Sequence, residues 1–369
     1  MLKREVSWVA AMAGVMLTLV VLTLTACGRT SPEVEFLKTL KAGWNLGNTL
    51  ESHRDGFYSD DPADFETLWE NSVTTKELIL FVKASGFNSI RIPVTWEPHM
   101  DESYSVDERW MDRVAEIVDY AYGEGMYVII NAHHDRWYIP SAENEARAKE
   151  VMRILWKQIA LRFAEYDERL LFESMNEPRL IGTAHEWTPG TAEAQRIVNE
   201  LNEVFVKTVR ECGGNNAGRY LVLPTYGANS KPEAIEAFRL PEGEKHLIAS
   251  VHFYNPHSFA SAEGTHARWS RDIPEDTEQI NRTIRALEHH FTGKGIPAMV
   301  GEFGAADKGN LSARLDWTSY ITEKARQSNI VCFWWDPGGR PAHPHAYSII
   351  NRRSLSVRFT EIQEVLTQD

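Results

Sequence analysis

The sequence Leu-Leu-Phe-Glu-Ser-Met-Asn-Glu-Pro at residues 170–178 decides the fold. Its apolar part has the length of a buried strand and is too short for a helix. Pro178 ends the strand and prevents a helix from starting there. Two polar residues, Asn176 and Glu177, come directly after the apolar part. The stretch therefore predicts a buried β-strand whose C-terminal end carries an amide and a carboxylate.

Eight short β-rich runs of this kind occur along the chain. They are found at residues 43–47, 90–94, 127–131, 170–175, 220–223, 247–251, 298–300 and 331–334. Amphipathic helical patterns lie between them, at residues 75–84, 106–122, 145–165, 191–210, 277–290 and 311–327. Strands that alternate with helices favour parallel pairing, and closing the sheet removes both of its edges. We therefore expect an α/β fold, a (β/α)8 TIM barrel that forms a single catalytic domain. A doubly wound open sheet is the alternative, but no glycine-rich phosphate-binding sequence follows the first strand.

Polar and aromatic residues follow almost every run at its C-terminal end. They are Asn48, Trp96, His133-His134-Asp135, Asn176-Glu177, Tyr226, His252 with Tyr254, Glu302, and Trp335-Asp336. In a barrel all of these positions converge on the one face where catalysis occurs.

Composition narrows the class of partner. The chain has 369 residues, and 39 basic against 52 acidic side chains give a formal charge of -13. With no lysine-rich run, neither nucleic acid nor an anionic lipid surface is expected as a partner, whereas a neutral substrate is compatible. Besides Cys27 the chain has only Cys212 and Cys332, which excludes a disulfide framework and a Cys-x-x-Cys metal site. A single disulfide bond between Cys212 and Cys332 is compatible with the sequence.

The N-terminal segment predicts export. Lysine and arginine precede an almost wholly apolar run at residues 6–24, which is the pattern of a signal peptide. Leu-Thr-Ala-Cys at residues 24–27 resembles the lipobox of bacterial lipoproteins, so we expect cleavage before Cys27 and lipidation of its thiol. This gives a lipoprotein signal peptide at 1–26, a lipidated tether at 27–36 and the catalytic domain at 37–369. The protein would be anchored to a bacterial membrane, at the cell surface or in the periplasm. An ordinary signal peptide with an incidental cysteine, or an uncleaved anchor helix, would also export it.

Glu177 and Glu302 form the candidate catalytic pair. Each follows an apolar strand, at the mouth of the barrel, where water is partly excluded and the pKa values of two carboxyl groups can be pushed apart. The fourth and seventh strands lie nearly opposite each other across a barrel mouth. The two side chains can therefore meet over a bound ring.

Seven motifs in order resemble glycoside hydrolase family 5, also called cellulase family A. They are Gly-Trp-Asn-Leu-Gly-Asn at 43–48, Ile-Arg-Ile-Pro-Val-Thr-Trp at 90–96, Asn-Ala-His-His at 131–134, Met-Asn-Glu-Pro-Arg at 175–179, His-Phe-Tyr at 252–254, Gly-Glu-Phe-Gly at 301–304 and Trp-Trp-Asp at 334–336. Residues 172–187 are similar to subfamily four, which contains endoglucanases and xyloglucanases. The resemblance implies a retaining endo-β-1,4-glucanase acting on cellulose-type glucan, mixed-linkage glucan or xyloglucan through a covalent glycosyl-enzyme. It implies a polysaccharide as the partner. We also expect no cofactor, no metal and a monomer.

The resemblance also assigns roles within the site. Glu177 is expected to be the general acid/base and Glu302 the nucleophile, with Arg91 keeping Glu302 ionised and Asn176 binding the 2-hydroxyl of the sugar. In its apolar setting, Glu177 is expected to keep its proton near neutral pH. The remaining predicted substrate-binding residues are Asn48, His133, His134, His252, Tyr254 and Trp335. Adjacent side chains on a strand face opposite ways, so one of Trp334 and Trp335 faces the cleft, and the resemblance implies that Trp335 forms the platform beneath the sugar.

Three other functions stay open. A metal-dependent barrel hydrolase would use His133-His134-Asp135, His252 and Asp336, although adjacent residues on a strand could not both ligate one ion. A non-catalytic glycan-binding lipoprotein would be expected to have lost one of the two glutamates or Asn176, and all three are present. A mannanase or an exo-β-glucosidase would share the same catalytic core, because loop shape sets that choice.

Overall fold

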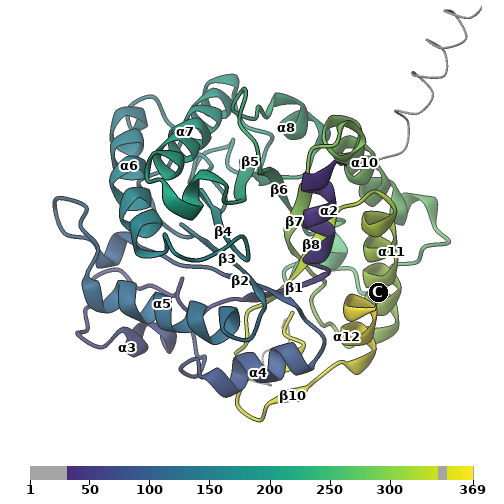
Figure 1. Ribbon diagram of the computed structural model, residues 1–369. Helices are drawn as coiled ribbons and strands as arrows, with labels where there is room; N and C mark the ends of the chain where they lie inside the picture. The colour runs from purple at the N-terminus through teal and green to yellow at the C-terminus, as the bar shows by residue number, and fades with distance from the viewer. Residues whose placement is uncertain (1–30, 340–346, 369) are drawn as a thin grey trace, which may run out of the picture.

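A closed barrel of eight parallel strands forms the centre of the protein in this computed structural model, which describes residues 31–339 and 347–368 (Figure 1). The strands are β1 (Ala42–Leu46), β2 (Ser89–Ile92), β3 (Tyr127–Asn131), β4 (Leu170–Glu173), β5 (Leu221–Asn229), β6 (Leu247–Phe253), β7 (Ala298–Phe303) and β8 (Val331–Asp336). Each strand pairs in parallel with the next, and β8 pairs with β1 to close the ring. The predicted (β/α)8 barrel is confirmed.

The six predicted helices surround the barrel. They are α4 (Lys76–Ala84), α5 (Glu108–Tyr122), α6 (Glu145–Arg162), α7 (Ala192–Glu211), α10 (Pro274–His290) and α11 (Leu311–Gln327). Side-chain caps fix where two of them begin: the Thr75 hydroxyl accepts the backbone N–H of Leu78, and the Thr191 hydroxyl accepts that of Ala194. Shorter elements fill the connections: α3 (Pro62–Glu66), η1 (Glu97–His99), η2 (Gly214–Ala217), α8 (Pro232–Ala237), α9 (His257–Ala260), η3 (Thr292–Lys294), α12 (Thr360–Thr367), and the antiparallel pair β9 (Ile350–Asn351) and β10 (Ser356–Val357).

Helix α2 (Pro32–Thr39) closes one end of the barrel, which corrects the predicted tether. Ser31 caps the helix by accepting the N–H of Val34, and it also donates a hydrogen bond to the carbonyl of Gly295. Leu37 and Leu40 are fully buried in the cluster that fills the barrel interior. The boundary predicted at residue 37 therefore lies inside a packed helix, and folded structure begins by Ser31. Serine followed by proline is an N-cap and first-turn signal that could have shown this.

The barrel interior has an apolar lower part and a polar upper part. The lower part contains Ile129, Leu171, Val222, Ile248, Met299 and Phe333. Two residues further along β3 and β4, alternation turns Asn131 and Glu173 to the same inner side, and both are fully buried. The upper part lies at the C-terminal ends of the strands, so the fold builds a polar ring at the barrel mouth.

Two glycines of the first strand's motif make room for aromatic rings on β8. A Cβ atom at Gly43 would lie 2.3 Å from the ring of Phe333, and one at Gly47 would lie 2.9 Å from the ring of Trp335. Any larger residue at either position would displace the neighbouring ring. The glycines therefore let the aromatic side chains of β8 lie against β1.

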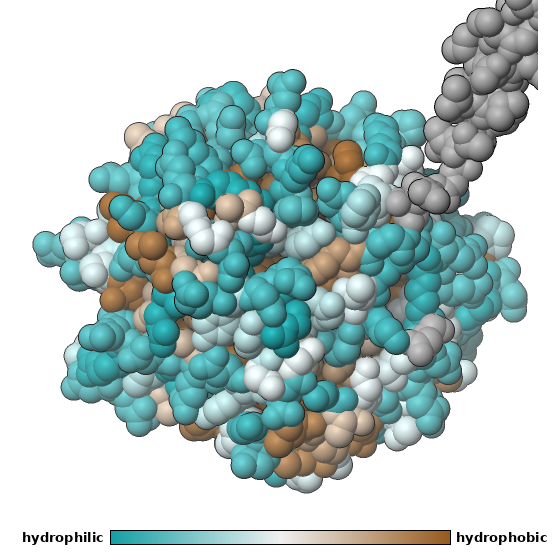
Figure 2. Space-filling model, in the orientation of Figure 1, coloured by the Kyte–Doolittle hydropathy of each residue, from teal (hydrophilic) through white to brown (hydrophobic). Residues whose placement is uncertain are grey.

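Several predictions about the rest of the chain can be compared with the structure. Cys212 and Cys332 are free thiols, so no bridge joins them. Within residues 31–339 and 347–368, no helix is both long and apolar enough to cross a membrane. The predicted signal peptide and Cys27 lie outside the described residues. The face seen in Figure 2 is mostly hydrophilic, with hydrophobic residues in small separate groups.

Candidate active site

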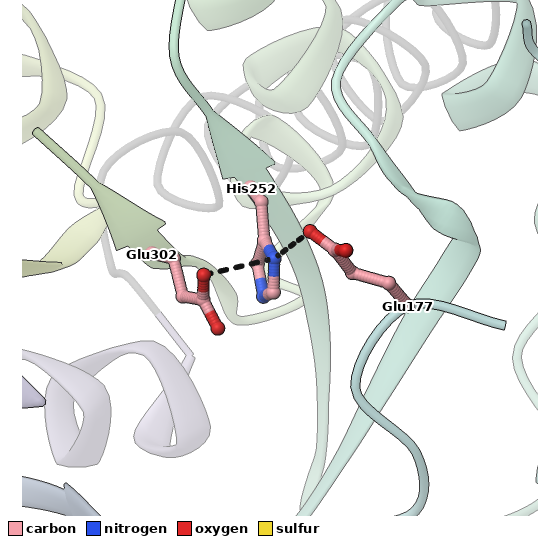
Figure 3. A group of neighbouring side chains, drawn as sticks. All are labelled: Glu177, His252 and Glu302. Atoms are coloured by element: carbon pink, nitrogen blue, oxygen red, sulfur yellow. Dashed lines mark hydrogen bonds and ion pairs between the residues drawn. The ribbon is translucent and has the colours of Figure 1, made fainter. Parts of the chain in front are cut away.

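Two carboxylates and a histidine meet at the barrel mouth (Figure 3). Glu177 follows β4, His252 lies near the end of β6, and Glu302 lies in β7. The Nδ1 atom of His252 is 2.8 Å from Oε1 of Glu177 and 3.6 Å from Oε2 of Glu302. The imidazole ring therefore lies between the two carboxylates, within hydrogen-bond distance of Glu177 and within ion-pair distance of Glu302.

The separation of the two carboxylates is short. One oxygen of Glu177 and one oxygen of Glu302 lie within 4.8 Å of each other. Carboxyl groups that act in retaining glycosidases are about 5–5.5 Å apart, whereas inverting enzymes need about 6.5–9.5 Å to place a water between them. The geometry is that of the retaining class.

Arg91, from β2, is the centre of the polar ring. Its Nη1 donates to Oε1 of Glu302 at 2.8 Å and to Oδ1 of Asn45 at 3.0 Å. Its Nη2 donates to Oδ1 of Asn176 at 2.8 Å. Since the side-chain oxygen of Asn176 is held by Arg91, the amide NH2 of Asn176 is the group that can donate to a ligand. The predicted pairing of Arg91 with Glu302 is present.

Glu173 is a site residue that sequence reasoning missed. It is fully buried on β4, where its Oε2 accepts 2.7 Å and 2.9 Å hydrogen bonds from Arg91 and Asn131. If the buried guanidinium of Arg91 contacted Glu302 alone, its Nε donor would lack a carboxylate partner. Glu173 supplies that second carboxylate. The available signal was an ionisable residue inside the apolar run at residues 170–175.

His133 is held as a neutral ring. Asn131 accepts the N–H of Val94 through its oxygen, so its amide NH2 is the group that faces Nδ1 of His133 at 3.1 Å. Burial, with the positive charge of Arg91 nearby, keeps the pKa of His133 well below its ordinary value. A neutral ring that accepts at Nδ1 carries its proton on Nε2, which lies 3.9 Å from Oε1 of Glu302.

The structure favours a different position for the proton shared by Glu177 and His252 than the one predicted from the sequence. Burial alone would raise the pKa of Glu177, but the hydrogen bond and charge of His252, with the charge of Arg179, outweigh it and lower the pKa. Burial likewise opposes the charged form of His252, yet the carboxylates of Glu302 and Glu177 raise its pKa. In the free protein the shared proton therefore resides on His252, and the expectation that Glu177 keeps it was wrong. The setting of Glu177 is buried but not apolar.

Tyr254 completes the surroundings of Glu302. Its hydroxyl donates to Oε2 of Glu302 at 3.0 Å. Burial and the adjacent negative charge of Glu302 raise the pKa of Tyr254 well above its ordinary value, so the hydroxyl stays protonated. Glu302 thus receives hydrogen bonds on both oxygens, one from Arg91 and one from Tyr254.

An aromatic wall extends the site to one side. The half-buried indole of Trp335 lies parallel to the His133 ring, with centroids 5.9 Å apart, whereas Trp334 is fully buried against Phe303. The ring of His134 lies 5.6 Å from that of Trp69 and 5.4 Å from that of His53. Sequence reasoning did not include Trp69 or His53, because neither follows a strand.

Asn48 lies in the loop after β1, in the left-handed region with φ 55°, which asparagine adopts more readily than most residues. Its carbonyl accepts a 2.7 Å hydrogen bond from the Asn71 amide, and its N–H donates to the buried Glu51. The loop is therefore fixed at the edge of the site, and the Asn48 side chain is half-buried there.

The acidic residues of the metal hypothesis have other partners. Asp135 accepts the backbone N–H groups of Trp96 and Glu97, and Asp336 accepts the indole N–H of Trp44. Among the described residues, the one cluster with donor atoms close enough to share an ion is Glu177, His252 and Glu302. Burial opposes the charged form of its histidine, but the two neighbouring carboxylates raise the pKa of the ring, which makes the cluster suited to moving a proton.

Comparison with known proteins places this geometry in a family. Residues 53–340 match the family described as cellulase (glycosyl hydrolase family 5). The cellulase/esterase CelE of Acetivibrio thermocellus is 39% identical over 337 residues, which are 90% of this chain and 40% of CelE. The chain thus spans less than half the length of that relative.

Two solved structures are similar over nearly the whole chain. A mutant glycoside hydrolase 5 lichenase from Caldicellulosiruptor sp. F32, in complex with cellotetraose, is 37% identical with a TM-score of 0.86, covering 92% of this chain and 95% of that one. A GH5-4 broad specificity endoglucanase from Ruminococcus champanellensis, with bound cellotriose, is 36% identical with a TM-score of 0.86, covering 92% and 99%. With a family match over most of its length and the paired glutamates in place, the chain belongs to glycosyl hydrolase family 5, the cellulase family.

Proposed function

We propose that the protein is a retaining endo-β-1,4-glucanase that cleaves β-glucans through a covalent glycosyl-enzyme. The observation that carries the proposal is the pair of carboxylates, Glu177 and Glu302, within 4.8 Å of each other beside the half-buried indole of Trp335. An indole face suits the flat C–H face of a sugar ring. The endoglucanases and lichenase among its relatives support a β-glucan as the substrate.

Glu302 is the nucleophile in this proposal. Its carboxylate attacks the anomeric carbon, and the bond from that carbon to the leaving sugar's oxygen breaks. The leaving oxygen takes the proton of the Glu177 and His252 pair, which passes from Nδ1 of His252 to Glu177 over 2.8 Å. The first step therefore ends with a glycosyl ester on Glu302 and an ionised Glu177.

The second step reverses these roles. Glu177, now a base, takes a proton from a water that attacks the anomeric carbon, and the ester bond to Glu302 breaks. The pair of Glu177 and His252 regains its proton, and the product keeps the β-configuration because two inversions have occurred. A histidine that stores the proton 2.8 Å away lets Glu177 act as acid in one step and base in the next.

The polar ring stabilises charge at the stages where it develops. Asn176, whose oxygen is held by Arg91, directs its NH2 to the 2-hydroxyl of the sugar, a contact that strengthens in the oxocarbenium-like transition state. Arg91 and Tyr254 hold both oxygens of Glu302 and so fix the direction of attack. His133, His134, His252 and Trp335 surround the same sugar, and Asn48 borders it at the loop after β1.

The test of this function is a panel of purified polysaccharides. We expect mixed-linkage glucan, carboxymethyl cellulose or xyloglucan to lose viscosity rapidly while few reducing ends appear, because internal bonds are cut. The Glu302→Ala variant is the control. A mannanase would instead prefer mannan, an exo-acting enzyme would release reducing sugar with little early loss of viscosity, and a glycan-binding protein would bind glucan without cleaving it.

We also propose that the protein is exported and carries a lipid on Cys27. The apolar run at residues 6–24 and the lipobox-like Leu-Thr-Ala-Cys at 24–27 support this. Several acyl chains hold a protein to a membrane where one chain would be marginal. Cys27→Ala should therefore be unprocessed or found in the soluble fraction, as judged by fractionation and labelling with a fatty acid analogue. A Cys27→Ala protein that is still processed and membrane-bound would disprove lipidation at this residue, and Cys212→Ala is the matched control.

A further inference from the structure

Arg179 contacts the carboxylate of Glu177 from the side opposite the catalytic histidine. His252 binds Oε1 of Glu177, whereas Nη1 of Arg179 lies 3.3 Å from Oε2. The same Nη1 donates to the backbone carbonyl of Glu177 at 3.1 Å. Glu177 is therefore held between two cationic donors, one from β6 and one from its own loop.

Two neighbours fix the guanidinium of Arg179. Its Nε donates to Oε1 of Glu186 at 3.2 Å, and its Cζ lies 4.3 Å from the ring of Trp187. Only 17% of the Arg179 side chain is exposed, while Trp187 is 60% exposed and covers it from the solvent side. The other oxygen of Glu186 accepts the N–H of Gly182, which ties the pair to the loop. A stacked and ion-paired guanidinium loses little further freedom when it holds a third group.

The loop after β4, which carries Glu177 and Arg179, is held in place by hydrogen bonds that do not involve the Arg179 side chain. The hydroxyl of Tyr226 accepts the N–H of Leu180 and donates to the carbonyl of His185, and the N–H of Gly227 donates to the carbonyl of Pro178 at 2.7 Å. These bonds tie both ends of the loop to β5. Replacing the Arg179 side chain therefore leaves the backbone supports of the loop in place.

Charged and titratable groups face Glu177 from several elements. They are His252 on β6, Glu302 on β7, His134 and Tyr138 after β3, Tyr254 after β6, and Arg179 on its own loop. Burial lowers the pKa of His134 to about 4, so this ring is neutral at working pH. Both tyrosines stay neutral because burial raises their pKa values well above the ordinary one. Arg179 is thus the permanent positive charge in direct contact with Glu177.

We propose that Arg179 is a positioning residue for the acid/base: held by Glu186 and Trp187, its guanidinium fixes the Glu177 carboxylate and sets how readily the Glu177 and His252 pair gives up its proton. This inference rests on the proposed function, in which that proton protonates the leaving oxygen. The positive charge of Arg179 favours loss of the proton. The negative charge of Glu186, which partly neutralises Arg179, favours its retention.

The pH profile of kcat/KM on a soluble β-glucan tests the proposal, because its alkaline limb reports loss of the last proton from the pair in the free enzyme. Arg179→Gln removes the positive charge, so the limb should move to higher pH by about one unit or less. Glu186→Gln leaves the charge of Arg179 unopposed, so the limb should move to lower pH. Arg179→Lys keeps the charge and should restore most of the wild-type limb.

The control is Arg196→Gln, which removes an ion-paired arginine from the exposed face of α7 and should leave the limb unchanged. A limb that stays at the wild-type position in Arg179→Gln, or that moves the same way in both variants, would overturn the proposal. If Arg179→Gln fails to fold, the Glu186→Gln variant still tests the proposal, because its alkaline limb must move to lower pH. Failure of the proposed function is a separate outcome, because the wild-type protein itself would then not hydrolyse glucan.

Discussion

Glu302→Ala should lower kcat on soluble β-glucan by a factor on the order of 10⁵ or more, the size of effect expected when the nucleophile of a covalent mechanism is removed. That factor corresponds to about 7 kcal/mol of activation free energy. The variant has no carboxylate oxygen that can attack the anomeric carbon, so no glycosyl-enzyme can form. Activated aryl glycosides should fail as well, since a better leaving group does not supply a nucleophile. Steady-state rates on both substrates measure this.

The loss in Glu302→Ala must be separated from unfolding. Arg91 keeps Glu173, Asn45 and Asn176 as hydrogen-bond partners in this variant, so the polar ring should persist. The thermal midpoint should stay within several degrees of the wild-type value, and added azide should restore turnover of aryl glycosides by entering the space of the missing carboxylate. A variant that keeps more than about one hundredth of the wild-type kcat would show that Glu302 is not the nucleophile.

Glu177→Ala should fail in a different way, with the second largest effect. On polysaccharide the rate should fall by about 10²–10⁴-fold, the range that general acid catalysis contributes, because the leaving sugar oxygen has no proton donor. On an aryl glycoside with a good leaving group the first step should survive. The second step should lag, because no base remains to activate water. Pre-steady-state kinetics should then show a burst of phenol followed by slow turnover.

His252→Ala is the matched comparison for Glu177→Ala. Its loss removes the group that stores the proton but leaves Glu177, so the pH profile should change while the burst does not appear. A Glu177→Ala protein that is equally slow in both steps on the activated substrate would contradict the assigned role. Equal losses on polysaccharide and aryl glycoside would contradict it too.

Much of the fold could be predicted because its signals are local. Helix α11 begins and ends at the residues that periodicity predicted, and β3 does the same. Strand β5 runs on to Asn229, past its predicted end at Leu223, because a register shift between Pro224 and Asn229 lets it continue pairing with β6. The short helices, such as α12, were missed because packing against a neighbour, here α11, stabilises them more than their own periodicity does.

The site was partly predictable for a related reason. Residues at or just beyond the C-terminal ends of strands, such as Glu302 and Glu177, are brought together by the topology alone. Partners that act through side-chain contacts across the ring, such as Glu173 with Arg91, need three-dimensional distances. The location of the proton was mispredicted because burial was taken as apolar, whereas His252 and Arg179 lie against the Glu177 carboxylate. The protonation state thus depends on neighbours that are distant in the sequence.

The most direct test of the central claim is the anomeric configuration of the two azide products. Both variants are incubated with an activated β-aryl glycoside and azide, and the products are assigned by proton NMR. Glu302→Ala should give the α-glycosyl azide, because azide attacks once from the face that the missing nucleophile occupied. Glu177→Ala should give the β-glycosyl azide, because azide attacks a glycosyl-enzyme already formed on Glu302. A β-azide from Glu302→Ala with an α-azide from Glu177→Ala would contradict the account and exchange the two roles.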